Sequence, residues 1–344
     1  MFNKNIEHYI FLFILLGITG AVGSKFKQYF VSNSDQEYDM IKNYLLNESP
    51  LYGNNKPKLW IHSKYEINAR KWLDFQSRNT YDMNQPYLYF TIQSIIDHCG
   101  SDFHICLIDD KSFGNLLDDW TIDVSSLCDP MKSCIREIAM LKILQKYGGM
   151  VAPDSFMCMK SLKSVYEANI YDDKMFVVES INRGVSMNDS VRSCFAPSMY
   201  FMGCQKGNSQ LESMIEQLMS ECRKGHITGE KHFVENKDHM LKRLVDEKKI
   251  NLVDGAIVGI KTYKGRAILL DDLMEDKFLD ISSDCCGIYI PKDELLVRTK
   301  YQWFAYLSKR EIMDANVAIV KYLKGSIVDI NTLLRNDFKA VTSL

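Results

Sequence analysis

Acidic side chains follow two short apolar segments of the sequence. Asp109 and Asp110 come directly after FHICLI (103–108), and Asp154 comes just after MVA (150–152). Carboxylate oxygens are hard ligands that suit Mg²⁺ or Mn²⁺, and a bound cation stabilises negative charge on a departing group. Carboxylates that follow a strand can equally bind hydroxyl groups or cap the next helix. Both uses of the Asp109-Asp110 pair are therefore kept as hypotheses.

Three further sites in the sequence have residue types suited to a polar ligand. His62 ends the apolar segment KLWIH, where it could contact a nucleotide or serve as a structural hydrogen-bonding group. Arg136 and Glu137 are neighbours on a predicted helix. The Arg136 guanidinium could bind a carboxylate or phosphate, or it could be a solvated surface group. Gly148 and Gly149 end that helix and are included among the candidate ligand-binding residues.

Short apolar segments alternate with amphipathic helical patterns through the body of the chain. This alternation predicts an α/β fold in which a mostly parallel sheet has helices on both faces. Ligands of such sheets bind beyond the carboxyl ends of the strands, so the acids at 109–110 and 154 are expected in one cleft. Asp129-Pro130 predicts a helix start. The expected strands are 58–62, 103–108, 150–152, 174–179 and 199–203, with strand-like segments within 250–300, and the expected helices are 87–98, 130–147, 211–222, 231–246 and 303–323.

The N-terminal region contains a segment without charged residues, IFLFILLGITGAV (10–22). With its uncharged flanks it would form a helix of about 24 Å, against roughly 30 Å of membrane hydrocarbon. Lys25 and Lys27 could extend its reach by snorkelling. We predict a single-pass membrane anchor; the alternatives are a cleaved signal peptide, which would leave a secreted or lumenal protein, and a soluble helix. The predicted organisation is an anchor or signal segment at 1–31, a stem at 32–57, a catalytic-type domain at 58–323 and a C-terminal tail at 324–344.

Composition excludes several classes of protein. The 42 basic and 44 acidic residues among 344 give a net charge of −2, which argues against a dedicated nucleic-acid-binding protein. The sequence has no G-x-S-x-G, Walker or G-x-G-x-x-G motif, which argues against common hydrolase, NTPase and dinucleotide-binding folds. None of the ten cysteines forms a C-x-x-C pair, so no zinc ribbon is predicted.

Four segments together resemble sugar transferases that carry an Asp-x-Asp motif. That family includes fungal initiating mannosyltransferases and bacterial capsular polysaccharide transferases. The resemblance implies a GT-A-like fold, a bound Mn²⁺ or Mg²⁺, a nucleotide-sugar donor and a glycan or protein acceptor. The matching segments are KPKLWIH (56–62), FHICLIDDKSF (103–113), the helix and Tyr-Gly-Gly region (138–154) and YFMGCQKGN (200–208).

The acids of the family motif are displaced in this sequence. The family places aspartates six and eight residues after the tyrosine of Tyr-Gly-Gly, and counting from Tyr147 gives Pro153 and Ser155. Asp154 lies between them, where an extended strand would turn it to the opposite face unless a bulge intervenes. The family's Asp-x-x-Arg corresponds to Glu137 and Met140, so the carboxylate is kept and the guanidinium is lost.

Two functional hypotheses follow from this mixture of matches and losses. In the first, the chain is a membrane-associated glycosyltransferase in which Asp154 binds the metal and Asp110 and Glu137 contribute metal or donor contacts. In the second, it is a transferase-derived protein without catalysis that serves as a structural or interaction module in a membrane or virion. The whole chain also resembles proteins encoded by large DNA viruses. Fold alone does not decide between the two hypotheses.

Overall fold

The computed structural model describes residues 56–63, 67–69, 79–83, 85–128, 131–181, 194–223 and 230–327, all within one compact unit. The predicted anchor, nearly all of the stem, most of the C-terminal tail and the helix start at 129–130 lie outside the described residues. No helix in the described part of the chain combines the length and the apolar character needed to cross a membrane.

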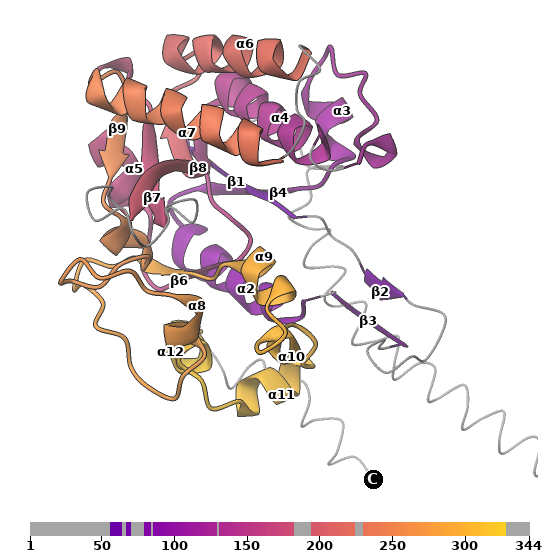
Figure 1. Cartoon of the computed structure of the whole chain (residues 1–344), viewed down its shortest axis with the longest axis vertical. Coiled ribbons are helices and arrows are strands. Elements are labelled where there is room, and N and C mark those ends of the chain that lie inside the picture. The colour runs from indigo at the N-terminus through magenta and orange to yellow at the C-terminus, as the bar shows by residue number, and fades with distance from the viewer. Residues whose placement is uncertain are drawn as a thin grey trace, which may run out of the picture. The chain divides into compact units, whose positions relative to one another are not determined.

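A six-stranded sheet forms the centre of the described residues, with the order β4-β1-β5-β8-β7-β9 (Figure 1). All neighbouring pairs are parallel except those of β8, which runs antiparallel to β5 and β7. The prediction of a mostly parallel α/β sheet is confirmed. The strands are β1 (Lys58–His62), β4 (His104–Ile108), β5 (Gly149–Val151), β7 (Phe176–Ile181), β8 (Phe195–Cys204) and β9 (Asn251–Val253).

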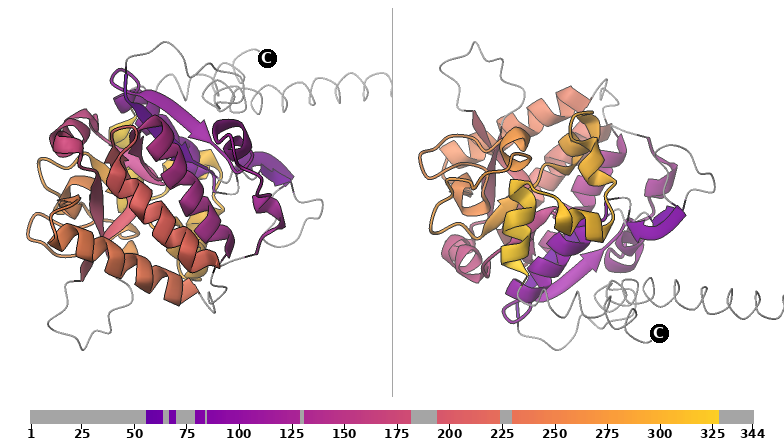
Figure 2. Two further views of the ribbon diagram at one scale, coloured as in Figure 1. Left: turned by 90° about the horizontal axis from the view of Figure 1, so that it is seen from above. Right: turned by 90° about the horizontal axis from the view of Figure 1, so that it is seen from below.

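Helices cover both faces of this sheet, as the alternating pattern predicted. On one side lie α4 (Met131–Tyr147), α6 (Ser209–Arg223) and α7 (Glu230–Asp246); on the other lie α2 (Tyr87–Cys99) and the C-terminal helices (Figure 1). Figure 2 shows the two layers from opposite sides, with the yellow C-terminal helices facing the viewer in the right-hand view. The remaining helices are α3 (Ser112–Leu116), α5 (Lys163–Asn169), α8 (Leu270–Leu273), α9 (Lys292–Val297), α10 (Gln302–Ala305), α11 (Lys309–Asp314) and α12 (Ala318–Ser326), with short 3₁₀ turns at Val124–Ser126, Tyr171–Asp173 and Gly255–Val258.

Two small antiparallel pairs complete the fold: β2 (Ile67–Ala69) with β3 (Asn79–Met83), and β6 (Phe156–Cys158) with β10 (Gly287–Tyr289). The second pair joins segments about 130 residues apart in the sequence. It brings the C-terminal part of the chain to the residues that follow β5.

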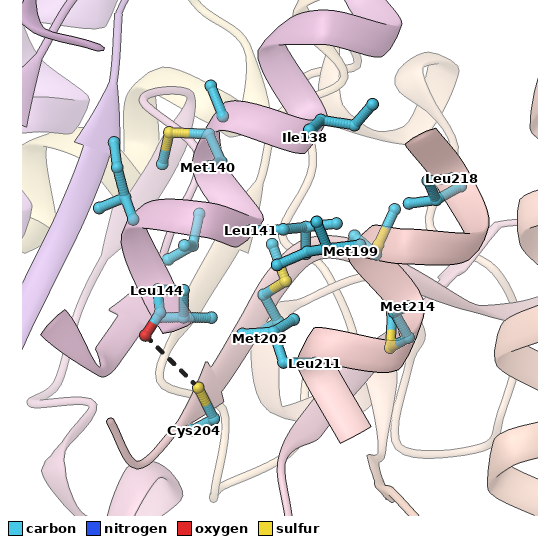
Figure 3. Packing of buried hydrophobic residues seen from close by; sticks show 14 of the residues in the cluster. Ile138, Met140, Leu141, Leu144, Met199, Met202, Cys204, Leu211, Met214 and Leu218 are labelled. Carbon is cyan, nitrogen blue, oxygen red and sulfur yellow. Dashed lines mark hydrogen bonds between the residues drawn. The ribbon is translucent and has the colours of Figure 1, made fainter. Parts of the chain in front are cut away.

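The sheet and the helices α4 and α6 enclose a methionine-rich core. Side chains of α4, β8 and α6 meet there (Figure 3), and the Cys204 thiol donates to the Leu144 carbonyl. Met140 is 6% exposed in this core, which explains an apolar residue where the resemblance expects arginine. The sulfur atoms of Cys134 on α4 and Cys222 on α6 are joined in a disulfide.

Three predictions about secondary structure were wrong. The strand-like segment AILL at 267–270 has one isolated bridge, from Ala267 to Lys261, before α8 begins at Leu270. The helix expected at 303–323 is three helices, because Ser308 caps α11 in a reciprocal pair with Glu311 and the chain is extended at Ala315 and Val317. The strand-like segment AIVGI at 256–260 begins as a 3₁₀ turn, because the Asp254 side chain accepts from the Ala256 N–H and so starts a helical turn.

Candidate functional site

The carboxyl ends of β4, β1 and β5 lie at one edge of the sheet. Trp60 in β1 is in register with Cys106 in β4 and with Val151 in β5, and all three strands run in the same direction. His62 therefore ends β1 beside the start of the Asp109-Asp110 loop, and Asp154 follows β5 at the same edge. We call this edge, with the side chains that meet there, the carboxyl-edge site.

Three of the predicted residues form a connected group within this site. The Arg136 guanidinium donates from Nε to Asp110 Oδ1 at 2.8 Å and from Nη2 to Oδ2 at 2.5 Å. His62 Nε2 lies 3.0 Å from Asp110 Oδ1, and its ring stacks on Phe113. Arg136 is 14% exposed and Asp110 is 25% exposed. Arg136 is therefore a partner of Asp110 and not a solvated surface arginine.

The environment of Asp110 favours its charged form. Burial acts to raise the pKa of this carboxyl, but the hydrogen bonds and positive charge supplied by His62 and Arg136 outweigh burial and hold the pKa well below its usual range. A two-point contact between guanidinium and carboxylate is also strongly directional. The group is therefore held in place from α4, β1 and the loop after β4.

Asp109 has a local role. Its Oδ1 accepts from the backbone N–H of Ser112 at 2.9 Å and from the Ser112 hydroxyl at 2.7 Å. These bonds close the turn that leads into α3. Asp109 therefore orders the turn before α3, whose N-cap position is Lys111, and Asp110 is the member of the pair that contacts Arg136 and His62.

Asp154 is buried and paired with a lysine that the sequence did not indicate. Its Oδ1 accepts from Lys292 Nζ at 2.6 Å, and its main-chain oxygen accepts from the Thr91 hydroxyl at 2.6 Å. The Asp154 side chain is 2% exposed, whereas that of Lys292 is 20% exposed. Burial, followed by the charge of Asp154, raises the pKa of the neighbouring Tyr87. Asp154 thus points toward a protein cation, and that cation reaches solvent.

A further ion pair joins Glu137, the neighbour of Arg136 on α4, to Lys237, and a pair of stacked tyrosines joins β8 to β10. Glu137 Oε1 accepts from Lys237 Nζ of α7 at 2.7 Å, while Glu137 Oε2 is buried without a hydrogen-bond partner among the described residues. Burial alone would lower the pKa of Lys237, but the charge of Glu137 raises it. Tyr200, half exposed on β8, stacks on Tyr289 of β10 with ring centres 5.9 Å apart. The sequence analysis missed Lys237, Tyr200 and Tyr289.

Gly148 and Gly149 have a structural explanation. Both have positive φ, at 69° and 104°, and a Cβ on Gly149 would lie 2.2 Å from the Lys58 main-chain oxygen. The Gly148 carbonyl accepts from Trp60 Nε1 at 2.9 Å. The Tyr-Gly-Gly segment therefore lets α4 turn directly into β5 against β1. Its use in ligand binding remains a prediction.

The side chains that the structure describes at this edge do not fit a resident divalent cation. Hard cations of this kind take several oxygen ligands. Within the described ranges, no three His, Cys, Asp or Glu side chains are grouped closely enough to hold a metal ion. Asp110 is engaged by Arg136, and Asp154 is engaged by Lys292.

Comparisons with known proteins give limited similarity. No protein-family model matches the sequence, and no curated protein matches it. Among solved structures, the apo-form glycosyltransferase GlyE of Streptococcus pneumoniae TIGR4 aligns with 84% of this chain at 10% identity and a TM-score of 0.39, and the chain spans 64% of GlyE. The PaToxG glycosyltransferase aligns with 64% of this chain and 78% of its own, at 12% identity and a TM-score of 0.30. Both TM-scores are below 0.5, so the assignment below is argued from the residues of this chain.

Proposed function

We propose that this chain has a GT-A-like fold and acts as a glycosyltransferase that binds a nucleotide-sugar donor at the carboxyl-edge site. The observation that carries the proposal is a pair of charged groups at one edge of the sheet: Arg136 and His62 contact Asp110 after β4, and Lys292 contacts Asp154 after β5. Strands β4 and β5 both lie parallel to β1, one on each side of it. Such strand ends are the usual ligand-binding edge of α/β sheets. The resemblance of four sequence segments to sugar transferases gives the same location independently.

The proposed roles follow from the charges of the site. Arg136 and Lys292 offer N–H donors to phosphate oxygens, while Asp110 offers carboxylate oxygens to ribose hydroxyls. Transfer would be a displacement at the anomeric carbon of the donor, with a glycan or protein hydroxyl as acceptor. The proposal therefore includes catalytic turnover, a nucleotide sugar as donor and a hydroxyl group of a glycan or protein as acceptor.

Calorimetric titration with UDP, GDP, ADP and CDP tests this assignment. We expect at least one nucleoside diphosphate to bind, and we expect Arg136→Met to weaken that binding by about 10- to 100-fold, the value of a charge-assisted hydrogen bond. Lys146→Met is the matched control, since Lys146 lies on the same helix but pairs with the exposed Asp118. The absence of binding by all four nucleotides would contradict the assignment.

A second candidate is a transferase-derived protein without catalysis. The observation that favours it is that both candidate acids, Asp110 and Asp154, are engaged by cations of the chain itself. This candidate could keep nucleotide binding but would not break the sugar–phosphate bond. Incubation with UDP-, GDP-, ADP- and CDP-sugars, followed by chromatography of the released nucleoside diphosphate, separates the two. If the wild-type protein releases more nucleotide than Arg136→Met does, the result supports the glycosyltransferase proposal over the candidate without catalysis.

The stacked pair Tyr200 and Tyr289 gives a further prediction about the same function. An exposed aromatic face commonly packs against the apolar face of a ligand ring, and the sugar of the donor or acceptor is the ring proposed here. We expect Tyr200→Ala to weaken nucleotide-sugar binding several-fold more than it weakens binding of the nucleoside diphosphate alone. Calorimetry with both ligands measures this difference. Tyr263→Ala, which changes another exposed tyrosine, is the control, and equal losses for both ligands would exclude a sugar contact.

We also propose that residues 1–31 attach the protein to a membrane as a single-pass anchor. The support is the uncharged segment at 10–22 and the lysines at 25 and 27 that follow it. We expect the full chain to partition into detergent and a chain that begins at Lys25 to remain in water. Partition of both chains into water would rule out the anchor. A mature N-terminus near residue 24 would instead indicate a cleaved signal and a secreted or lumenal protein.

A further inference from the structure

The residues after β5 contact a lysine at the place where the resemblance expects a metal ion. The two positions at which the resemblance expects aspartates are occupied by Pro153, which has no ligand group, and Ser155, which is fully buried. The Ser155 hydroxyl has no hydrogen-bond partner among the described residues. The one carboxylate in this stretch, Asp154, is bonded to Lys292 at 2.6 Å. A positive group therefore lies beside this loop, and the chain itself provides it.

The pairing of β6 with β10 brings Lys292 to this place. Tyr289 is in register with Phe156, and the Ile290 N–H donates to the Ser155 carbonyl at 3.1 Å. The antiparallel direction then carries the chain back past Asp154, so that Lys292 arrives at the carboxylate as the first residue of α9. The lysine is therefore positioned by a sheet pair and a buried ion pair.

We propose that the Lys292 ammonium takes the role of a divalent cation and binds the diphosphate of the donor, so that the carboxyl-edge site works without a metal. This inference rests on the proposed function. Two aspartates with one divalent cation have zero net charge, and one aspartate with one lysine also has zero net charge. An ammonium has three N–H donors. One of them is used by Asp154, and the Lys292 side chain is 20% exposed, whereas that of Asp154 is 2% exposed.

The chemical step is balanced without a further reactant. The bond between the anomeric carbon and the β-phosphate oxygen breaks, and its electron pair remains on that oxygen. The acceptor oxygen forms the new bond to the anomeric carbon and releases its proton to water. Lys292 donates a hydrogen bond to the departing diphosphate and stabilises the charge that develops on it.

Metal dependence of nucleotide binding is the direct test. The full chain is titrated with the nucleoside diphosphate that binds, once in EDTA and once in Mn²⁺. We expect binding in EDTA, with a dissociation constant that changes by less than about 3-fold when Mn²⁺ is added. We expect the double variant Lys292→Met/Asp154→Asn to lose about 10- to 100-fold in affinity, and Lys292→Arg to retain most of it.

The double variant is chosen because Lys292→Met alone would leave the buried Asp154 carboxylate without its partner and could unfold the protein. Circular dichroism and thermal unfolding confirm that the double variant is folded. Binding that requires Mn²⁺ would overturn the inference and leave the proposed function intact, as would unchanged affinity in the folded double variant. No binding of any nucleotide, with or without Mn²⁺, would overturn the proposed function and the inference together.

Discussion

Replacing Gly149 with alanine should destabilise the protein by about 3–5 kcal/mol. The residue has φ of 104°, which an alanine adopts only with strain, and the new Cβ would lie 2.2 Å from the Lys58 main-chain oxygen and 3.0 Å from its carbonyl carbon. These atoms belong to the adjoining strand β1 and cannot rotate away as a side chain could. Relief would therefore require β5 to separate from β1.

Urea unfolding followed by circular dichroism measures this change. Gly114→Ala is the matched control, because no atom lies within 4 Å of its Cβ and the residue is in the short helix α3. It should leave the free energy of unfolding within about 1 kcal/mol of the wild-type value. A Gly149→Ala variant as stable as Gly114→Ala would show that β5 does not approach β1 as closely as described.

Replacing Arg136 with methionine should lower the free energy of unfolding at neutral pH by about 1–3 kcal/mol. The change removes a two-point contact and leaves a half-buried carboxylate with His62 as its remaining partner in this group. Truncating one member of such a pair is costly because the other charge stays desolvated. The partial exposure of Asp110 keeps the expected loss below that of a fully buried pair.

The same variant should change how stability depends on pH. The pKa of Asp110 is lower in the folded protein than in the unfolded chain. Its contribution is therefore fully present above the unfolded pKa, about 4, and is lost as the pH falls toward the folded pKa. The curves for the wild type and Arg136→Met should differ most at pH 6–7 and approach each other below about pH 4.

Urea unfolding between pH 3 and pH 7 tests this behaviour. Asp110→Asn serves as the control, since it has no carboxyl to titrate at this position and should also show a weaker loss of stability in acid. Curves that stay parallel down to pH 3 would mean that Arg136 does not stabilise the charged form of Asp110.

The sequence predicted the scaffold well because its signals are local. The apolar segments KLWIH and FHICLI are buried strands, and the Tyr-Gly-Gly segment ends a helix and enters another strand. Parallel strands place their carboxyl ends together, so the common edge of His62, Asp110 and Asp154 followed from strand direction alone. The break within 303–323 was missed, because the apolar pattern continues through the capping residue Ser308.

The partners of the acids could not be predicted in the same way. The sequence left two interpretations of Arg136, as a group that binds a carboxylate or phosphate or as a solvated surface group. Helix periodicity does not show which strand end a helix faces. Lys292 lies 138 residues from Asp154, and the two meet only because β10 pairs with β6. Nothing near Lys292 in the sequence distinguishes it from other surface lysines. The sequence alone shows that the acids of the motif are displaced. The lysine that pairs with Asp154 can be identified only from the fold.

The most direct measurement of the central claim is a crystal structure of the protein with its nucleoside diphosphate, grown in EDTA. We predict that the phosphate oxygens lie within hydrogen-bonding distance of Lys292 Nζ, at the carboxyl ends of β1 and β5, with no metal ion between them. A nucleotide bound elsewhere on the molecule, or bound at this edge only through a metal ion when crystals are grown with Mn²⁺, would contradict the account.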